Sequence, residues 1–457
     1  MAAVFIASVL GPILFLGYRD LNDAQVAAAQ ARYPDAARSY ESAARKLFRR
    51  NDLWEQAGLA AYEGGDRDGA IRLLEIGRDK NSLSALGWDA LGLAYWTRDD
   101  HATALGIWQS ASQLNPAYPS IYDHLAVAYH EKSDYSSEQE ALTKRLALAE
   151  DAASHYRLGL LLTLADIDRA GREFTAASSL DPEFESAART LHTALNLAAL
   201  EPNPARRLVV IGRGLGLVEE WGLAATAFER AVEADARSAE AWAWLGEARQ
   251  HLGQDGGEAL DKALSLDPRD TVVRALRGLY WKRLGKYTDA LAEYLQAAQI
   301  EPQNPAWQVS AGEAYVQTGD LVSALAAYQK ATDLAPKDPT YWRLLAMFCA
   351  NNSLQVLGIG LPAAQKAAEL APADPLILDA LGWSYMKAGY LYNAEVNLLL
   401  AINLQPDLAV AHVHLAETYL KKGDTASAFN ELNLARQLDL DGPAGALAAQ
   451  LLKQYFP

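Results

Sequence analysis

Large apolar, small and polar residues recur along this chain with a spacing of about 34 residues. Between residues 88 and 95, the large apolar side chains fall three or four positions apart, which places them on one face of a helix. Gly92 and Ala104 stand where a second helix must approach closely, since larger residues would overpack that contact. The pattern therefore predicts pairs of short amphipathic helices along nearly the whole chain.

Glycine and proline mark the expected ends of these helices. Gly319 and Gly423 stand in turns between two paired helices, because glycine accepts the left-handed backbone that a helix C-cap needs. A proline closes most units, for example Pro116, Pro302 and Pro336, and the residue before a proline is disfavoured in a helix. Each unit is thus expected to contain two helices joined by a short turn.

The succession Trp88-x2-Leu91-Gly92-x2-Tyr95, followed by Ala104 and Pro116, resembles the tetratricopeptide repeat (TPR) family. The resemblance extends from about residue 17 to about residue 442. It implies an all-α fold, an α-solenoid of about eleven to twelve helix pairs forming a right-handed superhelix, with an apolar helix at its N-terminus.

A few units depart from the repeat pattern. Glu138 replaces a residue that is usually small, and Cys349 stands where an aromatic residue is expected. Residues 354–362 carry an insertion of about two residues. These departures affect local packing and leave the overall periodicity intact.

One stretch interrupts the spacing. Residues 185–200 have the apolar pattern of a single helix, and prolines follow at Pro202 and Pro204. We therefore predict five segments, namely an apolar N-terminal segment (1–18), a first TPR block (19–184), an irregular helix and linker (185–204), a second TPR block (205–442) and a C-terminal capping helix (443–457). Residues 185–204 are either a hinge between the blocks or a degenerate repeat that lost its second helix.

The N-terminal segment, Met1 to Gly17, contains no charged side chain. A helix of this length spans about 25 Å, close to the lower limit for crossing a bilayer. Arg19 and Arg32 follow the segment and no basic residue precedes it, which slightly favours repeats on the cytoplasmic face. The segment therefore predicts a single-pass membrane protein. A cleaved signal, which would make the protein periplasmic or secreted, and a buried capping helix are the alternatives.

Charge and motifs narrow the function classes. Acidic residues outnumber basic ones by 57 to 41, giving a net charge of −16, which argues against nucleic acid as a partner. Residues 212–216 resemble a phosphate-binding loop, but Leu217 stands where the last glycine is needed. His412 and His414 point to different sides of a helix and cannot share a metal. We expect no enzyme activity, cofactor, metal or small-molecule substrate.

The resemblance also indicates where a partner would bind. In TPR proteins the first helix of each pair lines a concave groove, and the residue after the small packing position points broadly toward it. The candidate groove residues are Leu59, Leu93, Trp96, Val127, Leu160, Arg213, Glu247, Glu313, Met347, Trp383, Met386 and Glu417. The alternative is that these side chains pack against neighbouring repeats. The Lys, Asn and Arg set with which the family binds chaperone C-termini is not found.

These observations predict a non-catalytic scaffold for protein–protein interactions, which assembles or stabilises a membrane-associated protein complex through its groove. An acidic rim on the second block would steer a basic or amphipathic segment. The alternative function is that of a secreted or periplasmic module that binds envelope polymers or exported proteins.

Overall fold

The computed structural model describes residues 2–456, and the side chains of residues 11–456. Its contacts divide the chain into two compact units, with the boundary between Ala227 and Phe228. In the first unit the helices are α1 (Ala2–Ala29), α2 (Tyr33–Lys46), α3 (Asp52–Glu63), α4 (Arg67–Asp79), α5 (Ala85–Trp96), α6 (His101–Leu114), α7 (Pro119–Glu131), α8 (Tyr135–Leu148), α9 (Ala152–Leu162), α10 (Ile167–Leu180), α11 (Glu185–Leu200) and α12 (Pro204–Leu217), with a 3-10 turn, η1 (Pro182–Phe184), before α11.

The boundary falls within α13 (Trp221–Ala234). In the second unit the helices are α14 (Ala239–His251), α15 (Gly257–Leu266), α16 (Thr271–Arg283), α17 (Tyr287–Ile300), α18 (Pro305–Thr318), α19 (Leu321–Leu334), α20 (Pro339–Asn351), α21 (Leu361–Leu370), α22 (Pro375–Lys387), α23 (Leu391–Leu404), α24 (Ala409–Lys422), α25 (Thr425–Leu438) and α26 (Pro443–Tyr455), with a π-helical turn, η2 (Val356–Gly360), before α21.

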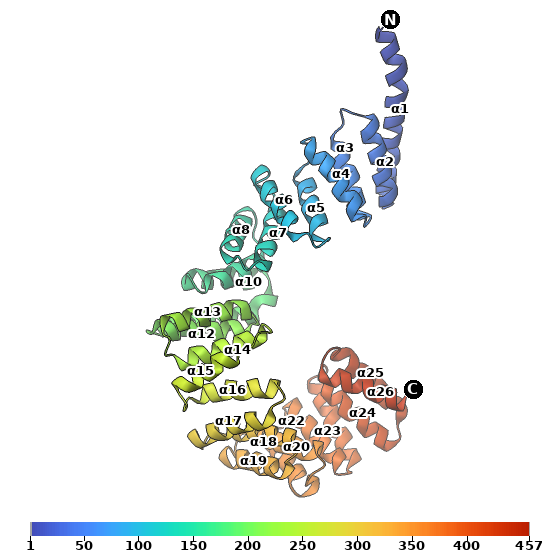
Figure 1. Cartoon of the computed structure of the whole chain (residues 1–457). Helices are drawn as coiled ribbons and strands as arrows, with labels where there is room; N and C mark the ends of the chain where they lie inside the picture. The colour runs from blue at the N-terminus through green and yellow to red at the C-terminus, as the bar shows by residue number, and fades with distance from the viewer. Residues whose placement is uncertain (1, 457) are drawn as a thin grey trace. The chain divides into compact units, whose positions relative to one another are not determined.

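The helices pack in pairs (Figure 1). In the first unit, α3 packs with α4, α5 with α6, α7 with α8 and α9 with α10. In the second unit, α14 packs with α15, α16 with α17, α18 with α19, α20 with α21, α22 with α23 and α24 with α25. The second helix of each pair also contacts the first helix of the next pair. Helix α11 packs between α10 and α12, and α26 packs against α24 and α25. The 26 α-helices of the described residues thus confirm the predicted all-α fold of paired repeat helices.

Small residues allow these helices to meet, as the spacing predicted. A Cβ atom added to Gly92 would lie 2.2 Å from Nε1 of Trp108 on the partner helix. A Cβ atom added to Gly278 would lie 2.4 Å from the Tyr294 ring. Each glycine therefore provides the space that the aromatic ring of the second helix fills.

Aspartates begin many of the second helices. Asp66, Asp100 and Asp134 each accept a hydrogen bond from the backbone N–H three residues further on, at the N-termini of α4, α6 and α8. These contacts satisfy N–H groups that have no partner inside the helix. At the preceding turn of later pairs, Gly319 and Gly423 have φ of 82° and 79°, the left-handed conformation expected there.

The N-terminal prediction requires a correction. Helix α1 does not end near residue 18 but continues to Ala29, past the charged Arg19 and Asp20. Leu21, Ala24 and Ala27 of this second half are buried in a core shared with α2. Within the described residues, no helix combines the length and the apolar character that a bilayer crossing demands. The prediction of a single-pass membrane protein anchored by residues 1–17 is therefore wrong, and the membrane-associated complex loses its support.

Glu41 links α2 to α4. Nη1 and Nη2 of Arg72 on α4 donate to Oε1 and Oε2 of Glu41 at 2.8 and 2.9 Å, and Arg45 donates at 2.7 Å. The hydrogen bonds from Arg72, supported by Arg45, lower the pKa of Glu41 to about 2. The carboxylate therefore stays ionised in the folded protein at pH values where it would be protonated in the unfolded chain.

This lowered pKa predicts a specific pH dependence of stability. The contribution of Glu41 is complete above its unfolded-state pKa of 4.5 and is lost as pH falls toward the folded-state value of about 2. Unfolding of the native chain and of Glu41→Gln should therefore differ most above about pH 5 and converge by about pH 2. The exposed Glu63→Gln is the control. A native-to-variant difference that is constant with pH would contradict this role.

Candidate partner-binding surface

The predicted groove residues differ widely in exposure. Four are buried in helix packing, namely Leu160 (0% exposed), Glu247 (4%), Trp383 (5%) and Met386 (0%). Leu59, Leu93, Trp96, Met347 and Glu417 are half-buried, whereas Val127, Arg213 and Glu313 are exposed. The four buried side chains thus follow the alternative of packing against neighbouring repeats.

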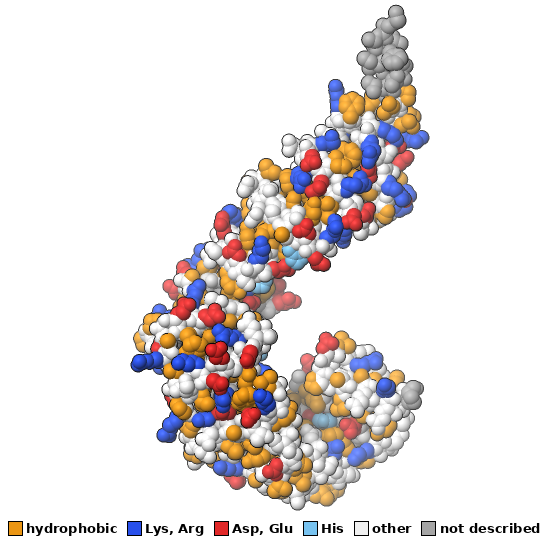
Figure 2. Space-filling view, viewed as in Figure 1, with side chains coloured by type: hydrophobic (Ala, Val, Ile, Leu, Met, Phe, Trp, Pro, Cys, Tyr) orange, Lys and Arg blue, Asp and Glu red, His pale blue; other side chains and the backbone are white. Residues whose placement is uncertain are grey.

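Two of the three acidic candidates hold neighbouring repeats together. Nη1 and Nη2 of Arg283 on α16 donate to the two carboxylate oxygens of Glu247 on α14 at 2.7 and 2.6 Å. Nζ of Lys282 donates to Oε2 of Glu313 on α18 at 2.7 Å. On the face seen in Figure 2, acidic and basic side chains are likewise interspersed. Both carboxylates therefore have a basic partner within the fold, but Glu247 is buried and Glu313 remains exposed.

The aromatic candidate of the second unit is also used in packing. Nε1 of Trp383 on α22 donates to Oδ1 of Asn351 at 2.7 Å. Its ring stacks on His414 of α24, with the ring centroids 4.0 Å apart. His414 in turn has Nδ1 at 2.7 Å from Oδ1 of Asp379. Trp383 therefore links three successive first helices, α20, α22 and α24.

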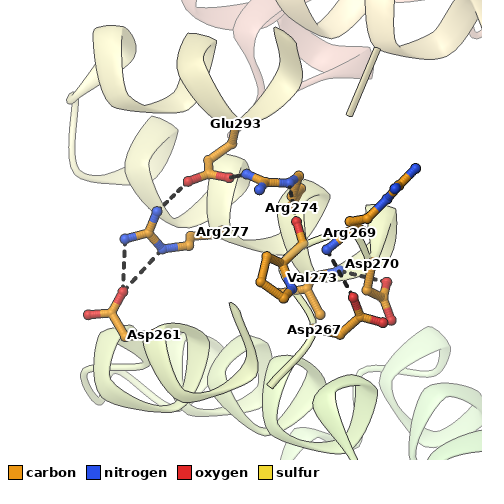
Figure 3. A network of polar contacts seen from close by, with 9 residues as sticks. Asp261, Asp267, Arg269, Asp270, Val273, Arg274, Arg277 and Glu293 are labelled. Carbon is orange, nitrogen blue, oxygen red and sulfur yellow. Dashed lines mark hydrogen bonds and ion pairs between the residues drawn. The ribbon is translucent and has the colours of Figure 1, made fainter. Parts of the chain in front are cut away.

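A polar network that the sequence did not reveal connects α15, α16 and α17 (Figure 3). The buried Glu293 of α17 accepts hydrogen bonds from Arg274, at 2.7 Å, and from Arg277, both on α16. Nη2 of Arg277 also donates to Oδ1 of Asp261 on α15 at 2.8 Å, and Nε of Arg274 to the Pro268 carbonyl oxygen at 2.9 Å. The network shares one buried carboxylate between two arginines and stabilises this region of the repeats.

Val127 lines a cavity of about 390 Å³ between α7 and α9. This side chain is 51% exposed. The buried Glu138 of α8 also lines this cavity and accepts hydrogen bonds from Nε and Nη2 of Arg157 on α9 at 2.5 and 3.1 Å. Nη1 of Arg157 donates to Glu220 at 3.0 Å. Arg157 therefore explains how the repeat tolerates glutamate at the position of a small residue.

A charged side chain on α7, Asp123, also lines this cavity and is held by a hydrogen bond. Asp123 on α7 accepts a hydrogen bond from Nε of Arg145 at 2.7 Å. Burial raises the pKa of Asp123, although Arg145 opposes this effect. The cavity thus combines a half-exposed apolar side chain with preorganised charges on two successive first helices.

Arg213, the other exposed candidate of the first unit, lines a second cavity of about 400 Å³ between α11 and α12. The sequence predicted α11 with the bounds that the structure gives it, Glu185–Leu200. The two exposed candidates of the first unit therefore each border a cavity, and these cavities are the candidate partner-binding sites.

In the part of the chain that the structure describes, no group of three or more His, Cys, Asp or Glu side chains has an arrangement that could hold a metal ion. Burial raises the pKa of the Cys349 thiol to about 11, so this side chain is protonated near neutral pH.

Comparison with known proteins gives three matches to models of the tetratricopeptide repeat, at residues 55–120, 218–272 and 283–348. The APC/C hetero-tetramer Cut9–Hcn1 aligns with 16% identity over 98% of this chain and 99% of that chain, with a TM-score of 0.40. Yeast Tom70 aligns with 14% identity over 96% and 95%, with a TM-score of 0.43. PilF of Pseudomonas aeruginosa aligns with 19% identity over 47% and 97%, with a TM-score of 0.39. No curated protein sequence matches the chain. At such identities and TM-scores, these structures carry no information about partners.

Proposed function

Because the chain is a tetratricopeptide repeat protein, a family of typically non-catalytic scaffolds for protein–protein interactions, we propose that it holds a segment of a partner protein on its first helices. The proposed surface lies along α7 and α9 and includes Val127 and the charged rim of the adjoining cavity. The partner segment would contact two successive repeats at once.

The cavity beside Val127 is the observation that carries this proposal. It offers about 390 Å³ of space, an exposed apolar side chain and fixed charged groups. Sites that bind other molecules commonly combine apolar walls with a few well-placed polar groups. Because Glu138, Arg157 and Asp123 are already held by other side chains, little ordering is needed when a partner binds.

Site-specific photo-crosslinking tests this surface. A benzoylphenylalanine at Val127 of the full-length chain should crosslink to a defined partner in extracts of the native source. The control position is Gly106 on α6, where an added Cβ meets nothing within 4 Å. We expect a discrete crosslinked species from position 127 and none from position 106. Equal crosslinking at both positions, or none at 127, would contradict the proposed surface.

A further inference from the structure

The cavity between α11 and α12 has a closed base and an open rim. At its base the two helices touch, because a Cβ added to Gly214 of α12 would lie 2.4 Å from Cβ of Ala194 on α11. Toward the rim the side chains are larger and remain accessible, with Leu197 56% and Leu217 75% exposed. Val210 completes the apolar lining. The cavity therefore has the form and chemistry to receive an apolar side chain.

The charge of this cavity is opposite to that of the protein. Its lining includes Arg189 and Arg213 and contains no acidic side chain, although the chain carries a net charge of −16. Arg189 pairs with Glu185 one turn earlier, but both side chains are exposed, and such a surface pair contributes little and is readily exchanged. Arg213 has its own contacts in the fold and still presents an exposed side chain.

The threonine hydroxyls of the lining are already used in hydrogen bonds, so an anion would be bound by the arginines. The hydroxyls of Thr190 and Thr193 already donate to backbone carbonyl oxygens, those of Ser186 and Arg189. A guanidinium group offers several N–H donors in a planar arrangement that matches a carboxylate. An acidic ligand with an apolar side chain therefore fits the cavity better than a basic ligand.

We propose that this cavity binds an amphipathic, acidic helix of a partner protein. A leucine or phenylalanine of that helix enters between α11 and α12, and a glutamate or aspartate about one turn away pairs with Arg189 or Arg213. Helix α11 packs against α10 and α12 and still presents Leu197, which is 56% exposed, so a helix of a partner can cover this part of its surface. The proposal rests on the proposed function of binding partner polypeptides but uses a different site from the cavity beside Val127.

Fluorescence anisotropy with the full-length chain tests this proposal. The probe is a fluorescein-labelled peptide of about four helical turns, with leucines on one face and flanking glutamates. A matched peptide carries lysine in place of each glutamate. We expect the glutamate peptide to bind about fivefold more tightly than the lysine peptide. Leu217→Asp should weaken its binding by about tenfold. Leu114→Asp, at an exposed position of α6, should leave binding unchanged.

Charge reversal provides the second arm of the test. Arg189→Glu should weaken binding of the glutamate peptide and strengthen binding of the lysine peptide, a swap that misfolding cannot produce. Equal binding of the two peptides, or no effect of Leu217→Asp, would overturn the proposal. Binding of oleate in place of both peptides would also overturn it, in favour of an anionic amphiphile. If the peptides do not bind as expected but position 127 crosslinks to a partner, the proposed function stands and this site is rejected. If the peptides bind as expected but position 127 does not crosslink, this site stands and the surface beside Val127 is rejected.

Discussion

Replacing Trp108 by Ala is expected to lower the stability of the surrounding repeats by about 3–5 kcal/mol. The Trp108 side chain is 1% exposed, and its ring stacks on His124 with the centroids 4.9 Å apart. The indole Nε1 has no hydrogen-bond partner among the described residues, so the expected loss comes from packing. Gly92, which faces the ring, has no side chain that could fill the cavity left by the substitution.

The effect of Trp108→Ala should be local, because each repeat of a solenoid contacts mainly its neighbours. Hydrogen exchange measured by mass spectrometry should show reduced protection in α5, α6 and α7 and little change in α23 to α26. Tyr392→Ala is the control, since the Tyr392 side chain is 75% exposed. Unchanged protection in α5 to α7, or an equal loss along the whole chain, would be inconsistent with this account.

Replacing Glu293 by Ala should cost about 3–5 kcal/mol in the second unit, because it leaves Arg274 and Arg277 without their shared buried carboxylate. Asp261→Ala provides a matched comparison, since Asp261 pairs with the same Arg277. The Glu293 side chain is 8% exposed and that of Asp261 is 65% exposed. The exposed pair is expected to contribute less than about 1 kcal/mol.

Urea unfolding followed by tryptophan fluorescence measures both substitutions. Trp281 is a suitable reporter, because its ring lies 5.3 Å from the Arg277 guanidinium carbon. We expect the unfolding transition of the second unit to move to lower urea for Glu293→Ala and to stay nearly in place for Asp261→Ala. Similar shifts for the two variants would mean that burial of the carboxylate does not determine its contribution.

The periodicity in the sequence was sufficient to predict the helix pairs and their close contacts. Gly92 opposite Trp108 is a direct result of the spacing, and the single helix at residues 185–200 was recognised because the spacing fails there. The insertion predicted at residues 354–362 corresponds to the π-helical turn η2, which follows Gln355 at a φ of 50°. These features depend on residues close in sequence, so a local pattern contains the information.

The candidate surface was less predictable, because exposure depends on the side chains of neighbouring repeats. Val127 and Leu160 occupy the same position of successive repeats, yet Val127 is 51% exposed and Leu160 is 0% exposed. Similarly, Glu247 was expected to face a partner and instead binds Arg283, a residue of another helix pair. Repeat position determines the face of a helix, whereas the residues of neighbouring helices decide whether that face is covered.

The N-terminal error has a related cause. The apolar run up to Gly17 has nearly the length of a membrane span, but the helix continues beyond it. Its second half pairs with α2 through Leu21 and through the ion pair between Asp20 and Lys46. Hydropathy alone could not separate an anchor from the start of a repeat helix.

The aspartates at the helix starts give the acidity of this protein a structural origin. Ten α-helices of the described residues begin with an aspartate that accepts a backbone N–H. They are ten of the 57 acidic residues of the chain, whose net charge is −16. Backbone and side-chain hydrogen bonds from Ser323 and Ser427 lower the pKa of Asp320 and Asp424, so their charge persists in mild acid. Part of the acidity behind the isoelectric point near 5.0 therefore serves to begin helices, and these carboxylates are already engaged within the fold.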